Sequence, residues 1–304
     1  MASQAFAADI VIGMPNWSSV RATAHILKVA IEDNLGLEVE VQNATNPIVF
    51  EAMDSGAMHV HPEVWLPNQQ NLYDTFVVEK GTVLRNPNGV AAFQGMCVDK
   101  ATADANGITA IEDLTNPDIA ALFDSDGDGQ GEVWIGAPGW ASTNAEKVRA
   151  KSYGYDQTLT LTEFDETLAY ANLASAITAG EAWVGFCYAP HYVFAQHGQD
   201  LVVLEEPPHD PDKWNVVQPT DSPSWLEDST AAVAWDSAYL HLHYAKELEE
   251  SHPQVANMLS NVKLDTDMVS AMAYAIGVDK KDPLEYAKQW VADNEDAVLS
   301  WIAN

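Results

Sequence analysis

Apolar and polar positions along the first 65 residues switch between strand and helix patterns. Residues 9–15 form a short apolar run that ends at a proline, which is typical of a buried strand. Residues 18–36 instead carry apolar side chains at helical spacing and stop at a glycine: Val20, Ala24, Leu27, Ala30, Ile31 and Gly36. A strand, a helix and a strand are then expected at 37–44, 47–56 and 58–65. This β-α-β-α-β order predicts a parallel sheet with helices on its faces.

The rest of the chain predicts a second α/β set and then a helical end. We expect strands at 89–100, 182–190, 201–207 and 230–236. We expect helices near 108–122, 143–153 and 163–179, and in almost everything after residue 237. Residues 205–228 are rich in Pro, Asp and Ser and predict a long functional loop. The fold class is therefore α/β with two lobes, residues 9–95 with 193–304 forming lobe 1 and residues 96–192 forming lobe 2. Such proteins bind ligands in the cleft between the lobes, at the C-terminal ends of strands.

Composition narrows the classes of partner. The formal net charge is −31, with only 14 Lys and Arg residues among 304. This balance argues against binding to nucleic acid or to an anionic membrane. The 47% of hydrophobic residues suffices for a sizeable core, yet no run of about 18 apolar residues predicts a transmembrane helix.

The N-terminus and the two cysteines suggest export. Residues 1–8 include AFAA, which resembles the small-residue end of a trimmed secretory signal, although an ordinary frayed terminus fits as well. Cys97 and Cys187 fit one disulfide in an exported protein and fit two buried free thiols equally well.

Four large rings follow predicted strands directly and lie next to chain-breaking residues: Trp17, Trp65, Trp140 and Tyr188. Rings at strand ends are more exposed than rings in mid-strand, and rings from both lobes would face one cleft. A quaternary ammonium ion cannot donate hydrogen bonds, so π faces are its natural partners, worth about 0.5–2 kcal/mol per ring. Core packing is the alternative for any single ring. Trp225, in the long loop, is a further candidate.

An acidic, glycine-rich segment precedes Trp140. Residues 124–129 match the start of an EF-hand-type calcium loop, but the bidentate Glu of the twelfth position is absent because residue 135 is Ile. The candidate ligands are Asp124, Asp126, Asp128, Gln130 through its carbonyl, and Glu132. We predict a structural calcium ion that stiffens the turn leading to Trp140; a solvated acidic turn is the alternative.

Three motifs in this order carry a family resemblance: EVWLPN at 63–68, DIAALFDSDGDGQGE followed by GAPGW within 118–140, and CYAPHY at 187–192. The chain resembles periplasmic substrate-binding proteins of ABC importers for glycine betaine, proline betaine and related quaternary amines. The resemblance implies the type II periplasmic-binding-protein fold, each lobe a mainly parallel sheet flanked by helices. It also implies an ABC permease as partner and no enzymatic activity.

The resemblance also implies site residues. Trp65, Trp140 and Tyr188 match an aromatic box, in which the last position is usually Trp, and Trp17 matches an additional wall. His191 matches a residue that clamps a betaine carboxylate. The amides of residues 141–143 match a carboxylate cradle at a helix N-terminus.

The ligand is expected to be a trimethylammonium-type compatible solute, with trimethylamine N-oxide favoured over glycine betaine, choline and dimethylsulfoniopropionate. One reason is that Glu63 and Glu132 flank the aromatic motifs, and a carboxylate facing the box would repel a betaine carboxylate. The other is that HPEVWLPN at 61–68 resembles the trimethylamine N-oxide-binding branch of the family. Glu132 cannot easily serve both calcium and ligand, and the metal role is favoured. A metal-dependent amine hydrolase is the alternative from another class, because His59 with His61, and His241 with His243, could bind zinc.

Overall fold

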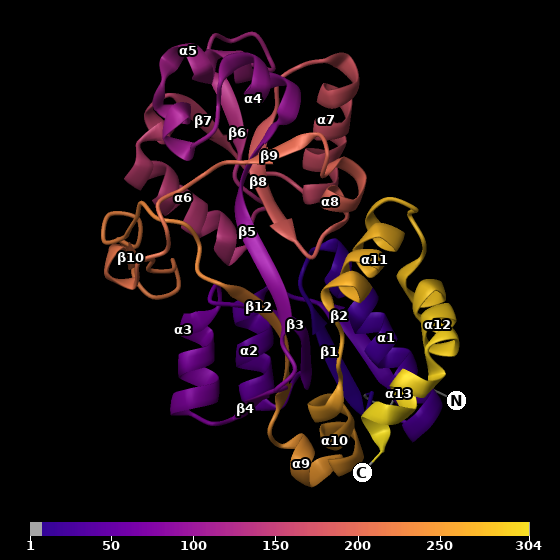
Figure 1. The fold of residues 1–304 in the computed structure, drawn as a ribbon. Helices are drawn as coiled ribbons and strands as arrows, with labels where there is room; N and C mark the ends of the chain where they lie inside the picture. The colour runs from indigo at the N-terminus through magenta and orange to yellow at the C-terminus, as the bar shows by residue number, and fades with distance from the viewer. Residues whose placement is uncertain (1–7, 304) are drawn as a thin grey trace, which may run out of the picture. The chain divides into compact units, whose positions relative to one another are not determined.

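The computed structural model describes residues 8–303 and divides the chain into two compact units (Figure 1). Unit 1 combines the chain up to Ala92 with the chain from Tyr239 onward, and unit 2 is Phe93–Ala238. Residues 1–7 of the predicted signal remnant lie outside the described residues.

Unit 1 contains a mixed sheet of strand order β2-β1-β3-β12, with β4 paired to β12. The strands are β1 (Ile10–Met14), β2 (Val39–Asn43), β3 (Val60–Leu66), β4 (Val83–Arg85) and β12 (Ala238–Ala245). The pairs of β1 with β2 and β3 are parallel, as the early sequence pattern predicts. The pairs of β12 with β3 and β4 are antiparallel, because β12 returns from the far end of the chain.

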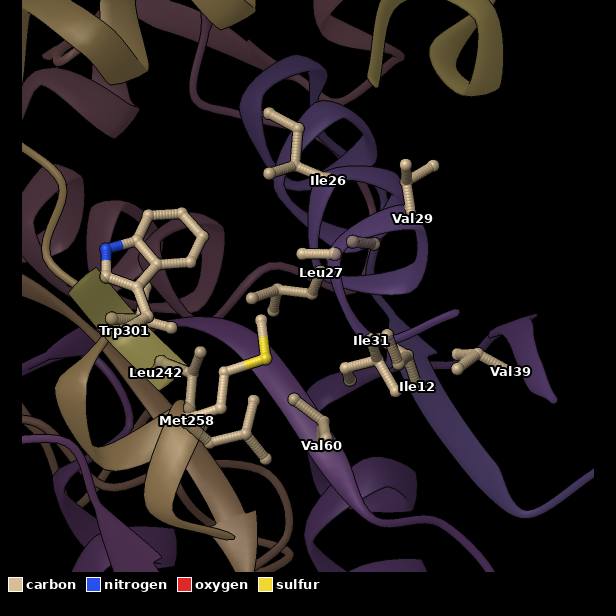
Figure 2. Packing of buried hydrophobic residues seen from close by; sticks show 14 of the residues in the cluster. Ile12, Ile26, Leu27, Val29, Ile31, Val39, Val60, Leu242, Met258 and Trp301 are labelled. Atoms are coloured by element: carbon tan, nitrogen blue, oxygen red, sulfur yellow. The ribbon is translucent and has the colours of Figure 1, made fainter. Parts of the chain in front are cut away.

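The helical segments of unit 1 come from both ends of the chain. They are α1 (Ser18–Leu35), α2 (Asn46–Ser55), α3 (Gln70–Tyr73), the π-helical turn η1 (Asp74–Glu79), α9 (Leu248–Ser251), α10 (Pro253–Asn261), α11 (Thr266–Gly277), α12 (Pro283–Asp293) and α13 (Glu295–Ile302). Helix α1 ends at Gly36, whose φ of 70° is the left-handed conformation that glycine adopts at low cost. Its apolar face packs with Ile12, Val60 and Met258 in the core of this unit (Figure 2).

The expectation that almost everything after residue 237 is helical is wrong for β12. Ala238–Ala245 is a buried strand that pairs with β3, His243 lying opposite His61. Leu240, Leu242 and Tyr244 alternate with histidines at a period of two, which is a strand pattern.

Unit 2 contains a second mixed sheet of order β5-β8-β6-β7, with β9 paired to β5. The strands are β5 (Val90–Asp99), which begins in unit 1, β6 (Gly131–Trp134), β7 (Leu159–Thr162), β8 (Val184–Ala189) and β9 (Leu201–Val203). The pairs of β6 with β7 and β8 are parallel, whereas β5 runs antiparallel to β8 and β9. A separate pair joins β10 (Trp214–Asn215) to β11 (Thr230–Ala231), so the strand expected at 230–236 is only two residues long.

The helical segments of unit 2 are α4 (Lys100–Asn106), the 3-10 turns η2 (Ile111–Thr115) and η3 (Ala121–Phe123) on either side of α5 (Pro117–Ala120), α6 (Ala141–Tyr153), the turn η4 (Tyr155–Gln157), α7 (Glu166–Ala179), α8 (Tyr192–His197) and the turn η5 (Pro211–Lys213). The helix expected near 108–122 is thus three short pieces. Pro117 begins α5, since proline is tolerated in the first helical turn and disfavours a helical residue before it.

The chain leaves unit 2 later than expected. Residues 193–238 belong to unit 2 and not to the first lobe, so the predicted return near residue 192 is corrected to residue 238. The reason is that the long loop and the residues just after it bond to α6. Lys151 donates to the carbonyls of Leu226 and Ser229, and the amide of Ala231 donates to Ser152 Oγ at 2.9 Å. Polar contacts of this kind leave no periodic signal in the sequence.

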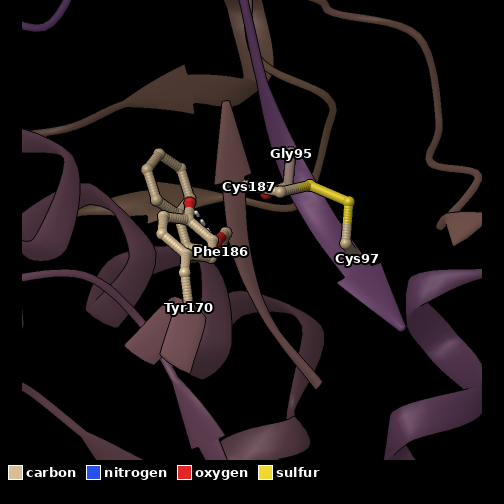
Figure 3. The surroundings of a disulfide bond; sticks show 5 residues. All are labelled: Gly95, Cys97, Tyr170, Phe186 and Cys187. Carbon is tan, nitrogen blue, oxygen red and sulfur yellow. Dashed lines mark hydrogen bonds between the residues drawn. A yellow bond between two sulfur atoms is a disulfide. The ribbon is translucent and has the colours of Figure 1, made fainter. Parts of the chain in front are cut away.

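The two cysteines form a disulfide between β5 and β8, which settles the alternative left open above (Figure 3). Cys187 lies opposite Gly95, and Cys97 lies opposite Gly185. The bond closes a separation of 90 residues and is wholly buried. It therefore ties the strand that enters unit 2 to the strand that carries Tyr188.

Two buried histidines face each other across β3 and β12. His61 Nε2 donates to Asn46 Oδ1 at 2.8 Å, and His243 Nδ1 donates to the carbonyl of His241 at 3.2 Å. The remaining nitrogen of each ring has no hydrogen-bond partner among the described residues. Burial lowers the pKa of His61 to about 3 and lowers that of His243 well below its ordinary value.

These shifts predict that acid destabilises unit 1. The unfolded chain protonates each histidine below about pH 6.5, whereas the folded chain keeps both neutral, so stability is lost as pH falls below that value. Each group contributes about 1.4 kcal/mol per pH unit. In denaturant titrations from pH 7.5 to 5, replacing His61 by Gln should reduce the loss of unfolding free energy by about that slope. Parallel curves for the two proteins would contradict this account.

Candidate ligand-binding site

In unit 1, a buried glutamate fixes one of the predicted rings. Glu63, on β3, is 3% exposed and accepts hydrogen bonds from three side chains. Trp17 Nε1 donates to Oε2 at 2.8 Å, Ser19 Oγ donates to the same atom at 2.7 Å, and Thr23 Oγ1 donates to Oε1 at 2.5 Å. All three donors come from the start of α1 or the residue before it, so the helix and the carboxylate position each other.

Trp65 lies on the same strand as Glu63. Side chains two positions apart on a strand point to the same face, so the indole of Trp65 and the carboxylate of Glu63 share one face of β3. Trp65 is buried. Glu63, noted in the sequence because it flanks the aromatic motif, is therefore a structural neighbour of Trp17 and of Trp65.

In unit 2, three of the predicted residues come together. Trp140 is the N-cap residue of α6, Tyr188 lies near the end of β8, and His191 is the N-cap of α8. The rings of Trp140 and Tyr188 have centroids 5.8 Å apart and meet at 86°, and the ring of His191 lies 4.6 Å from that of Tyr188. They converge because β6 and β8 are adjacent and parallel, so the residues that follow both strands are at the same edge of the sheet.

Sequence reasoning missed the residue at the centre of this group. Glu166, the first residue of α7, is 3% exposed and accepts a hydrogen bond from the hydroxyl of Tyr188. Burial, and secondly the charge of Glu166, raises the pKa of Tyr188 well above its ordinary value. The available signal was the N-cap Asp165 before a helix that follows β7, but only the strand order β8-β6-β7 brings that helix start to the same edge.

His191 is held in one tautomer. Its Nδ1 accepts the backbone N–H of Val193 at 3.2 Å, so in the neutral ring the proton is on Nε2. Nε2 lies 3.6 Å from Glu166 Oε2, an ion-pair distance, and makes no hydrogen bond among the described residues. The helix N-terminus after Trp140, also predicted as a contact, has no side-chain cap.

The other two predicted ligand contacts lie outside this group. Trp225 is half-buried in the turn that precedes β11, where its carbonyl accepts Ser229 Oγ at 2.5 Å. Glu132 Oε2 accepts the amide and the hydroxyl of Ser125 at 2.8 and 2.6 Å. Glu132 also lines a hollow of about 390 Å³ together with Trp134 and Trp183. Both residues remain predictions as ligand contacts.

The acidic loop brings together four of its predicted calcium ligands. Carboxylate oxygens of Asp124, Asp126, Asp128 and Glu132 lie within 4.8 Å of one another. Loop amides orient the aspartates, as when Gly127 and Gly129 donate to Asp124 at 2.7 and 2.9 Å. An all-oxygen, anionic donor set suits a hard cation such as calcium. The residues present therefore fit calcium, and the ion stays a prediction.

The chain matches the OpuAC family over residues 8–293, a family described as the substrate-binding domain of ABC-type glycine betaine transport systems. The chain belongs to this family. It is therefore a substrate-binding protein of a betaine-type ABC importer, and its relatives bind solutes and are not enzymes. No helix within residues 8–303 is long and apolar enough to cross a membrane.

Two curated relatives and one solved structure illustrate the similarity. The trimethylamine N-oxide-binding protein of Pelagibacter ubique (strain HTCC1062) is 24% identical over 94% of this chain and 88% of its own. The glycine betaine/proline betaine-binding periplasmic protein of Escherichia coli (strain K12) is 23% identical over 78% of this chain and 72% of its own. Lactococcal OpuAC, in its closed-liganded conformation with glycine betaine, is 21% identical, with a TM-score of 0.70 over 97% of this chain and 99% of its own. The predicted type II periplasmic-binding-protein fold is confirmed.

Calcium should stabilise this family member through the acidic loop. At a hundredfold excess over its Kd, a ligand that binds only the folded state adds about 2.7 kcal/mol, which corresponds to a rise in Tm of about 5 °C. We expect that rise on adding CaCl₂ to chelator-treated protein, and its loss in Asp126→Asn. Asp118→Asn, an equal charge change outside the loop, is the control and should respond as the unaltered protein does. A calcium-independent Tm in the unaltered protein would contradict the predicted calcium site.

Proposed function

We propose that this substrate-binding protein takes up a trimethylammonium-type compatible solute, trimethylamine N-oxide first, through cation–π contacts. The observation that carries the proposal is the pairing of aromatic rings with buried carboxylates in each unit. Trp17 bonds to Glu63 in unit 1, and Tyr188 bonds to Glu166 in unit 2. Such a pairing is suited to a guest that is positively charged and apolar at once.

The arrangement of the rings in unit 2 supports a methylated onium as the ligand. Trp140 and Tyr188 meet at 86°, as two walls of a box do. A trimethylammonium group is bulky, carries its charge on methyl surfaces and donates no strong hydrogen bonds, so ring faces solvate it better than polar side chains do. The carboxylates that accept from the rings' N–H and O–H groups also increase the negative potential near those faces.

Trimethylamine N-oxide fits the polar groups as well as the rings. Its oxygen is a single, strongly accepting atom attached directly to the nitrogen, and His191 Nε2 carries the proton of the neutral ring. The similarity to the trimethylamine N-oxide-binding protein extends over 94% of this chain, against 78% for the glycine betaine/proline betaine-binding relative. Glycine betaine, choline and dimethylsulfoniopropionate are the alternative ligands.

The proposal includes the setting of the protein. An importer delivers its solute through transmembrane permease subunits, which we propose as the macromolecular partner, and the substrate-binding protein would act in the periplasm. The relative from Escherichia coli is a periplasmic protein by name, and the buried disulfide suits an oxidising compartment.

Paired substitutions at Trp140 test the cation–π contact. Trp140→Phe keeps a π face, whereas Trp140→Leu has similar apolar bulk and none. Because a desolvated ring contributes about 2 kcal/mol, the Leu variant should bind about 30-fold more weakly than unaltered protein, with the Phe variant between them. Calorimetry with trimethylamine N-oxide, glycine betaine and choline side by side measures these affinities. Trp65→Phe and Trp65→Leu provide a second test.

Two results would count against the proposal. Equal affinities of the Phe and Leu variants would exclude a cation–π contribution at that position. Absence of binding of all three solutes to the unaltered, folded protein would contradict the trimethylammonium ligand itself.

A further inference from the structure

Glu166 is a charged group built into the unit 2 site. Its side chain is buried, with 3% exposure, and it is the first residue of α7, a helix of 14 residues. The positive end of a helix dipole stabilises a carboxylate there. Burial, and secondly the charge of Glu166, raises the pKa of both Tyr188 and Tyr170. The helix start favours the ionised form of Glu166, which lies beside the rings that the proposed function assigns to the ligand.

Tyr188 and His191 each place a donor group near the carboxylate of Glu166. The hydroxyl of Tyr188 donates to Glu166 Oε2, and the Nε2 of His191 lies 3.6 Å from the same atom. The other nitrogen of His191 is occupied by the amide of Val193. His191 was predicted as a clamp for a betaine carboxylate, but a ligand carboxylate that reached His191 Nε2 would stand next to the Glu166 carboxylate.

A ligand carboxylate bonded to His191 Nε2 and the carboxylate of Glu166 would repel each other strongly, because little water screens buried charges. A hydroxyl group meets no such penalty: it can donate to Glu166 and accept from His191 Nε2–H. An N-oxide oxygen also carries a formal negative charge, but the positive nitrogen is one bond away and offsets most of the repulsion, so the oxygen needs only the His191 donor. A carboxylate carries a full negative charge and has no proton to donate to Glu166.

Resting on the proposed function, we propose that Glu166 is a specificity-determining residue that selects methylated onium ligands without a carboxylate. The ligand class is thereby narrowed to onium compounds whose polar group is an N-oxide, a hydroxyl or a carboxamide. Glycine betaine and other carboxylate-bearing solutes are disfavoured by the fixed negative charge. Tyr188 and His191 are positioned by Glu166 and supply ring faces and one N–H donor.

A matched pair of ligands tests this without altering the protein. Glycine betaine and its carboxamide, betaine amide, have the same onium group and almost the same shape, and differ in the charge of the polar end. Calorimetry on the full-length protein should show betaine amide bound at least tenfold more tightly. Glycine betaine bound as tightly as its amide, or more tightly, would overturn the proposal.

Replacing Glu166 tests whether the preference for betaine amide over glycine betaine depends on this residue. Glu166→Gln should lower the amide-to-betaine affinity ratio at least tenfold, because it removes the charge while keeping the shape. Glu181→Gln, an equal charge change at an exposed site just beyond the far end of α7, is the control and should leave the ratio unchanged. Tyr188→Phe, which removes the hydroxyl and keeps the Glu166 charge, should also retain the discrimination. An unchanged ratio in folded Glu166→Gln protein would refute the role of Glu166.

The outcomes separate this inference from the function on which it rests. If the unaltered protein binds none of trimethylamine N-oxide, choline, glycine betaine and betaine amide, the proposed function fails. If it binds onium ligands but shows no preference against the carboxylate, the proposed function stands and the role of Glu166 fails.

Discussion

A carboxylate removed from water must be surrounded by hydrogen-bond donors, and in this protein that requirement fixes the aromatic rings. Glu63 draws in the indole N–H of Trp17 together with two hydroxyls of α1, and Glu166 draws in the hydroxyl of Tyr188. In both units, the polar group on the edge of an aromatic ring donates a hydrogen bond to a buried carboxylate. A positively charged guest suits a ring face whose edge donates to a carboxylate.

The parallel strands deliver these groups to one place within unit 2. Trp140 follows β6, Tyr188 lies near the end of β8, and Glu166 begins the helix that follows β7. These three strands are neighbours in the sheet, so three segments far apart in the sequence meet at one edge. Beneath this edge the disulfide joins β5 to β8, and Tyr170 Oη donates to the carbonyl of Phe186 at 3.3 Å (Figure 3). Of the three strands that carry the site, β8 is thus tied to β5 by a covalent bond.

The family assignment and the local chemistry address different levels of the same function. Membership of the betaine-type substrate-binding family states that the chain carries a solute to an importer. Which solute it carries depends on the few polar groups beside the rings, because every methylated onium offers the same surface to the π faces. The contacts of Glu166 with Tyr188 and His191 are therefore where we propose that the specificity of this chain is decided.

The sequence by itself determined the local elements with a strong period and the residues with distinctive chemistry. The sequence predicts the apolar face of α1 and the glycine at its end. It also predicts the acidic loop and the rings after strands. Two predictions are wrong: the sequence predicts helix for Ala238–Ala245, which is a strand, and assigns residues 193–238 to the first lobe, whereas they belong to unit 2. The alternation of apolar residues with histidines in Ala238–Ala245 is a strand pattern, but it is short and is followed by helical segments. A loop held by side-chain bonds to α6 has no period at all.

Only the tertiary structure decided that the cysteines bond, and that Glu166 stands between Tyr188 and His191. The sequence separations are 90 residues for the cysteines and 22 residues between Tyr188 and Glu166. Both depend on strand order, which local propensity does not encode. Burial then changes the chemistry, because a carboxyl group withdrawn from water depends on nearby donors, here the hydroxyl of Tyr188 and the start of α7.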